Sequence, residues 1–189
     1  MNGSISDKIG NLTKLKSFLV GSNKLTGTIP TTIGNCQALE LLTLSENKSS
    51  GPIPKELGNV QTISEIVLGW NELTGPLPSE IFSPSLAALW VLHVQYNELT
   101  GQIPNNWVQL PNLAHLALHD NKLSGTLSAV AEGEFPHLQT LGIQHNDITG
   151  KVDDNLCKWP CWWISADCKP PAGGGPPQVN CSCCSECFE

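Results

Sequence analysis

The 189-residue chain contains no arginine, and all ten of its basic residues are lysines. Arginine is the forked donor that proteins commonly use to grip phosphate and guanine. The formal net charge is −7, which is the wrong sign for contact with a phosphate backbone. The sequence therefore predicts that no nucleic acid is a partner.

Long apolar runs are also missing. No segment approaches the ~18 to 20 apolar residues that a membrane-spanning helix needs. The opening residues, MNGSISDKIGNL, lack the charged and apolar blocks of a signal peptide. We expect neither a membrane span nor an export signal within these residues.

Catalytic motifs are a third absence, because the chain has no GxSxG, HExxH, phosphate-binding loop or dinucleotide-binding motif. Asp153 and Asp154 are adjacent, so on a strand they would face opposite ways. His115 and His119 would be about 13 Å apart on a strand rising ~3.3 Å per residue, too far to share one ion. We therefore predict a protein that is not an enzyme and has no cofactor or metal.

What the chain does contain is a recurring motif, written NKLTGTIP, NELTGPLP and NELTGQIP. Apolar residues stand three, five and eight positions before each motif asparagine, and the two nearest indicate a short strand that buries alternate side chains. The asparagines recur at intervals of 24, 24, 26, 24 and 25 residues, within the ~20 to 29 residues of leucine-rich repeats. They are Asn23, Asn47, Asn71, Asn97, Asn121 and Asn146.

Each motif asparagine follows a strand, where the chain turns a corner and buried backbone groups need partners. An amide side chain both donates and accepts, so it can bridge its own coil and the next. We therefore predict a structural ladder of these six asparagines. A glycine four residues later suits a positive φ, and the proline after the next apolar residue presets φ for the turn that follows.

The pattern LxxLxxLxLxxNxLTGxIPxxIGNL resembles the plant-type extracellular leucine-rich repeat of receptor-like kinase ectodomains and polygalacturonase-inhibitor-like proteins. The resemblance covers residues 1 to about 156. It implies an α/β-type solenoid, a right-handed superhelix with a concave parallel β-sheet and a convex side of 3-10 and irregular turns. It also implies binding as the usual role.

The C-terminal tail is rich in cysteine and carries a PPAGGGPP segment. We predict two units: a solenoid over residues 1–156, with a partial first repeat and six further repeats, and a cysteine-rich cap over residues 157–189. The tail resembles the ends of leucine-rich-repeat proteins of diatom-type algae. The extracellular resemblance implies disulfides among Cys157, Cys161, Cys168, Cys181, Cys183, Cys184 and Cys187.

Other readings of these cysteines stay open. Zinc held by four thiolates is one alternative, on Cys181, Cys183, Cys184 and Cys187, and free thiols are another. Seven cysteines cannot all pair among themselves, so one is free or bonded to a partner, and the pairing cannot be read from the sequence. Cys36 occupies an apolar position of its repeat and is read as a buried thiol.

Two further features concern the processing of the chain. Asn11 and Asn180 stand in glycosylation triplets, whereas the triplet of Asn47 falls in the predicted ladder. The first residues align with the second half of a repeat, so we expect a piece of a longer chain whose export signal lies upstream.

Candidate binding residues occupy the variable strand positions, whose side chains point away from the core and gather on the concave face. Aromatic side chains among carboxylates are typical of a recognition surface. We interpret the histidines on this face as exposed side chains that share no metal or acid-base function, with pH-sensitive recognition as the alternative. The predicted ligand-binding residues are Glu46, Trp70, Trp90, His93, Gln95, Tyr96, His119, Asp120 and His145.

The functional prediction is a non-catalytic recognition module that binds a protein, a peptide or a cell-wall glycan through its concave face. We expect it to belong to a secreted or cell-surface, receptor-like glycoprotein that acts in signalling. Two alternatives remain open at this point: a structural adhesion or surface-coat protein, and an inhibitor of a secreted glycosidase.

Overall fold

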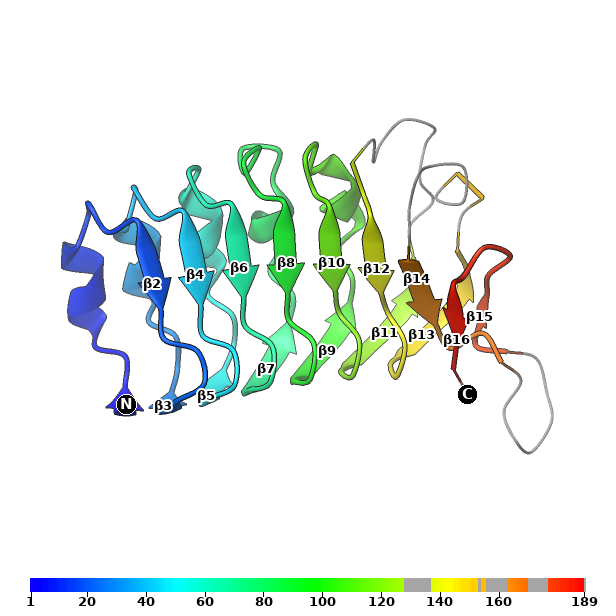
Figure 1. Cartoon of the computed structure of the whole chain (residues 1–189), viewed down its shortest axis with the longest axis horizontal. Helices are drawn as coiled ribbons and strands as arrows, with labels where there is room; N and C mark the ends of the chain where they lie inside the picture. The colour runs from blue at the N-terminus through cyan, green and yellow to red at the C-terminus, as the bar shows by residue number, and fades with distance from the viewer. Residues whose placement is uncertain (128–136, 153, 156–162, 170–176, 189) are drawn as a thin grey trace.

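The computed structural model describes residues 1–127, 137–152, 154–155, 163–169 and 177–188. In these residues the chain forms a solenoid with two parallel sheets of eight short strands each (Figure 1). The first sheet comprises β2 (Ser17–Leu19), β4 (Leu41–Thr43), β6 (Glu65–Val67), β8 (Val91–His93), β10 (His115–Ala117), β12 (Thr140–Gly142), β14 (Trp163–Ala166) and β16 (Glu186–Cys187). We call its outward side the concave face.

The second sheet follows the corner of each coil. It comprises β1 (Asn2–Ser4), β3 (Lys24–Gly27), β5 (Lys48–Gly51), β7 (Glu72–Pro76), β9 (Glu98–Gln102), β11 (Lys122–Thr126), β13 (Asp147–Lys151) and β15 (Val179–Asn180). In the described ranges, five 3-10 helices then return the chain: η1 (Asp7–Asn11), η2 (Thr31–Asn35), η3 (Lys55–Asn59), η4 (Ser79–Phe82) and η5 (Asn105–Gln109). The predicted fold class, a parallel sheet with 3-10 turns opposite, is confirmed.

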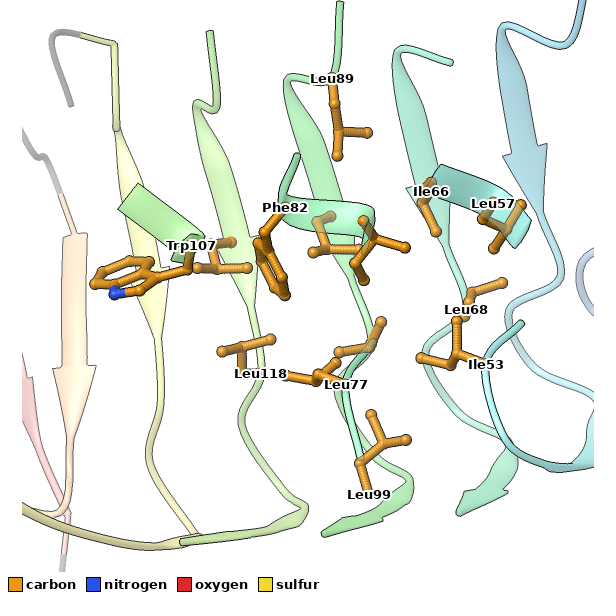
Figure 2. Close-up of a cluster of buried hydrophobic side chains, with 14 of the residues drawn as sticks. Ile53, Leu57, Ile66, Leu68, Leu77, Phe82, Leu89, Leu99, Trp107 and Leu118 are labelled. Carbon is orange, nitrogen blue, oxygen red and sulfur yellow. The ribbon is translucent and has the colours of Figure 1, made fainter. Parts of the chain in front are cut away.

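The core lies between the first sheet and the 3-10 helices. Figure 2 shows Ile66 of β6, Leu68 just after it and Leu57 of η3 within one cluster of buried side chains. All three side chains are fully buried, as is Trp107 of η5. The apolar positions that define the repeat are therefore the positions that form the core, and burial of such side chains is the main stabilising term of the fold.

Glycine and proline set the turns between the two layers. Gly75 and Gly101 have φ of +78° and +76°, a left-handed conformation that glycine adopts without a side-chain clash. Pro54 and Pro78 stand directly before η3 and η4 with φ of −63° and −69°. In the first coil Ser6 takes the proline position, and its hydroxyl accepts a hydrogen bond from the Lys8 amide at 3.3 Å.

The tail adds strands to both sheets. β14 pairs with β12 and β16 pairs with β14, while β15 pairs with β13. The predicted boundary between residues 156 and 157 lies outside the described residues. The division into a solenoid and a separate cap therefore stays a prediction.

Disulfides hold the tail together. Cys168 pairs with Cys187, Cys181 pairs with Cys184, and Cys183 is also disulfide-bonded. All four cysteines of the alternative zinc site are disulfide-bonded, so they cannot bind zinc as thiolates. The zinc hypothesis is therefore wrong. Cys157 and Cys161 lie outside the described residues. Elsewhere in the described chain Cys36 is a free, fully buried thiol, and burial raises its pKa.

In the described residues, no group of three or more histidine, cysteine or acidic side chains is arranged to hold a metal ion. Within the same part of the chain, none of the helices has the length and apolar character needed to cross a bilayer.

Candidate binding surface

The motif asparagines form hydrogen bonds both within and between coils. Asn71 Nδ2 donates to the carbonyls of Leu68 and Gly69 in its own coil, at 3.0 and 3.3 Å. It also donates to the Leu44 carbonyl of the preceding coil at 2.9 Å, while its Oδ1 accepts from the Ser49 amide at 2.9 Å. The same four contacts recur at Asn47, Asn97, Asn121 and Asn146.

Asn23, the first asparagine of the ladder, has a different donor to its Oδ1 atom. Its Nδ2 donates to the Val20 and Gly21 carbonyls at 3.0 and 2.8 Å, and its Oδ1 accepts from the amino group of Met1. Together the rungs fix the corner that every coil turns after its strand on the concave face.

The residue just before each asparagine has a positive φ, between 52° and 59°, although none of the six is a glycine. Such angles are uncommon outside glycine, and for bulky residues they mark a constrained turn. This column of corner residues carries most of the candidate site. Its members are Ser22, Glu46, Trp70, Tyr96, Asp120 and His145.

Two of these corner residues form an aromatic stack. The Trp70 and Tyr96 rings lie 3.7 Å apart between centroids with an interplanar angle of 20°. They remain 51% and 37% exposed, so the stack presents apolar area to solvent. The His119 ring meets Tyr96 edge-on at 5.2 Å. Desolvation, followed by the nearby Asp120 carboxylate, raises the pKa of the Tyr96 hydroxyl.

Asp120 joins two histidines to this stack. Its carboxylate oxygens lie 2.7 Å from His119 Nδ1 and 2.9 Å from His145 Nδ1. The His145 ring in turn meets Phe188 of the tail edge-on at 5.0 Å. A continuous row of contacts therefore runs across coils, and every member except Phe188 carries a charged or hydrogen-bonding group.

The other predicted residues lie on the same face but outside this row. Trp90 is 41% exposed and meets the His115 ring at 5.7 Å, and Glu46 accepts a hydrogen bond from the Ser22 hydroxyl at 2.7 Å. His93 is half-buried on β8, and desolvation, with His115 and His119 nearby, lowers its pKa.

Gln95 lies over the backbone of the preceding coil. A Cβ placed at Gly69 would come within 2.8 Å of the Gln95 side-chain carbonyl carbon, so the glycine makes room for the amide. The Gln95 Oε1 atom is buried and has no hydrogen-bond partner in the described residues.

A hollow with a volume of about 250 Å³, which the sequence did not predict, lies at the C-terminal end of the concave face. Trp163, Ser165 and Glu186 of the tail contribute to it, beside Ala117, Gly142, His119, Gln144, Thr140 and Leu116. A signal existed, because Ile164 follows its register partner Leu141 by 23 residues, close to the repeat period. The motif asparagine is absent from this part of the tail, so an alignment of the repeats on that asparagine does not include it.

Asp167 is another feature that the sequence did not predict, and its side chain is buried, with 3% exposure. Its carboxylate accepts hydrogen bonds from the backbone amides of His145 and Asn146 at 2.9 and 3.3 Å. One coil earlier, the equivalent amides of Asp120 and Asn121 donate to backbone carbonyls of the next coil. A carboxylate therefore replaces two carbonyl acceptors where the corner geometry changes.

Comparison with known proteins agrees with this architecture. The Leucine Rich Repeat family model matches residues 14–36. The plant peptide hormone receptor RGFR1, solved in complex with RGF2, is 31% identical with a TM-score of 0.80, over 88% of this chain and 27% of that one. The ectodomain of the Arabidopsis thaliana receptor kinase GASSHO1/SCHENGEN3, in complex with CASPARIAN STRIP INTEGRITY FACTOR 2, is 28% identical with a TM-score of 0.81, over 98% and 24%.

A third similar structure is the BIR3–SERK2 complex of Arabidopsis thaliana, at 28% identity and a TM-score of 0.59, over 72% of this chain and 69% of that one. Comparison with curated proteins gives no match. The chain is a leucine-rich-repeat solenoid that resembles plant receptor ectodomains, a non-catalytic fold. It spans roughly a quarter of the length of RGFR1 and of the GASSHO1/SCHENGEN3 ectodomain. These matches give no support to the diatom-type resemblance of the tail.

Proposed function

We propose that the protein recognises a peptide or an extended protein segment through the concave face, as part of a secreted or cell-surface receptor-like protein. The observation that carries the proposal is the exposed Trp70–Tyr96 stack, held on rigid corners and joined to the Asp120 histidine pair. Large, preorganised aromatic side chains are the usual anchors of protein recognition.

Three further observations support it. Two of the similar structures hold a named peptide hormone or factor. The tail disulfides fit an oxidising, extracellular compartment. Asn11 and Asn180 are exposed, so both remain candidates for glycosylation and belong to the same proposal.

The test is selection of binders from a random peptide library displayed on phage, using the full chain as bait. Selected peptides should bind Trp70→Ala and Tyr96→Ala about thirtyfold more weakly, since loss of a buried aromatic anchor costs ~2 kcal/mol. The exposed Lys55→Ala on η3 is the control and should bind normally. The proposal fails if no peptide is enriched, or if the enriched peptides bind the aromatic variants as well as the original protein.

A further inference from the structure

We propose that the C-terminal hollow of the concave face is a pocket for an arginine side chain of the bound peptide. This inference rests on the proposed recognition of a peptide and specifies one part of that ligand. The pocket adjoins the Trp70–Tyr96 stack through His119, which lines the hollow and meets the Tyr96 ring, and it is built in part by the cysteine-rich tail.

The floor of the hollow is low because small residues line up across three neighbouring strands. Ala117, Gly142 and Ser165 occupy the same register on β10, β12 and β14. In the preceding coils that register holds the larger Val67 and His93. The depression therefore follows from side-chain size at one column of the sheet.

The walls offer one aromatic face and oriented polar groups. Trp163, 44% exposed, stands beside the floor on β14. Opposite, Gln144 Oε1 accepts from the Ser165 hydroxyl at 2.6 Å, and the His119 ring is fixed by its bond to Asp120. These partners hold the wall residues in place before any ligand arrives.

Glu186 supplies the charge. It pairs in register with Ser165, so its side chain faces the concave side, and the Cys168–Cys187 disulfide ties its strand to the segment that follows β14. Among the described lining residues it is the one acid, and none is a lysine. Trp163 stands two residues before Ser165, the register partner of Glu186, so Trp163 and Glu186 are diagonal neighbours on adjacent parallel strands.

The charge on the rest of the face points to a cationic ligand. Glu46 and Glu65 lie on the strand side of the solenoid, whereas Lys16 is neutralised there by Glu40 at 2.9 Å. A planar guanidinium can stack on an indole face and pair with a carboxylate at the same time, which an ammonium does less well. An arginine therefore fits both the aromatic wall and the acid.

The probe is Nα-acetyl-arginine amide, titrated into the full chain while the Trp163 indole N–H resonance is followed by NMR. Trp163→Phe assigns that resonance. We expect a saturable shift, and at least about tenfold weaker binding of the citrulline analogue, which has the same shape without the charge. An equal response to citrulline overturns the proposal, as does a shift caused by methyl glucoside in place of the arginine probe.

Two variants test the residues. Glu186→Gln should weaken binding of the arginine probe about tenfold, because it removes only the charge. Gly142→Val should abolish binding by filling the floor, since a Cβ there would lie 2.9 Å from His119 Cδ2. Unchanged binding to Glu186→Gln overturns the proposal, whatever Gly142→Val does to folding. Lys55→Ala, the exposed control on η3, should leave the probe response intact. Because the titration uses no selected peptide, this pocket and the proposed peptide function can fail independently.

Discussion

At the scale of single residues, the corner column combines constraint with exposure. A non-glycine residue in the left-handed region costs roughly 1 to 2 kcal/mol, and Trp70 and Tyr96 both adopt it. The conformation persists because the asparagine that follows each of them is held by four hydrogen bonds. The aromatic anchors are therefore fixed in the free protein, which lowers the entropy cost of binding.

His93 gives a prediction about pH at this scale. Desolvation lowers its pKa from the ordinary value of 6.5, so the folded state holds the imidazole neutral while the unfolded chain protonates it near that value. Its contribution to stability is complete above pH 6.5 and is lost as the pH falls from there through the lowered pKa.

The measurement is urea unfolding between neutral and mildly acidic pH. His93→Gln should lose less stability on acidification than the original protein, because its side chain binds no proton. His137→Gln, an exposed position, is the matched control and should follow the original protein. Identical pH dependence in all three proteins would contradict the assignment.

At the scale of elements, the unit of the fold is one strand, one corner and one return. The coil that follows β6 is longer than its neighbours, yet Ile66 still pairs in register with Leu92. The added residues lie after η4, where Ser83 and Ser85 hydrogen-bond to each other at 2.8 Å. Extra length is absorbed on the return, so the concave face keeps its register.

Coupling between these elements depends on the asparagines. Asn71→Ala removes the acceptor of the Ser49 amide and the donor to three carbonyls, those of Leu44, Leu68 and Gly69, in a part-buried corner. Leaving such groups unpaired should lower the free energy of unfolding by roughly 1 to 3 kcal/mol. The measurement is the urea unfolding curve of each purified variant.

Asn59→Ala is the matched control. Asn59 is exposed at the end of η3, and its side chain makes no hydrogen bond in the described part of the chain. Its removal should change stability by less than ~0.5 kcal/mol. Equal, small effects of both substitutions would mean that the hydrogen bonds of Asn71 contribute little to folding.

At the scale of the whole molecule, the repeat made most of the fold predictable. The spacing of apolar residues and asparagines defines the coil, and neighbouring parallel strands ~4.8 Å apart bring Trp70 and Tyr96 together. The left-handed corners were not predictable, because serine, glutamate, tryptophan and histidine share no preference for that angle. The surrounding hydrogen bonds impose it.

The tail marks the limit of that reasoning. It keeps the strand register, with Ile164 opposite Leu141, but lacks the asparagine that made the repeats visible. Asp167 serves the corner with a different set of bonds, so no motif signalled it. The hollow beside Trp163 depends on this strand, and sequence periodicity alone could not place it.

The asparagine ladder also has a polarity. Each inner rung bonds to its own coil and to the preceding one, so Asn71 holds the Ser49 amide while Asn97 Oδ1 holds the Leu73 amide at 2.9 Å. In Asn71→Ala, hydrogen exchange at Ser49 should therefore accelerate, while the Leu73 amide stays protected. A local defect would therefore expose an amide of the coil on the N-terminal side, while the amide that the next rung holds keeps its acceptor.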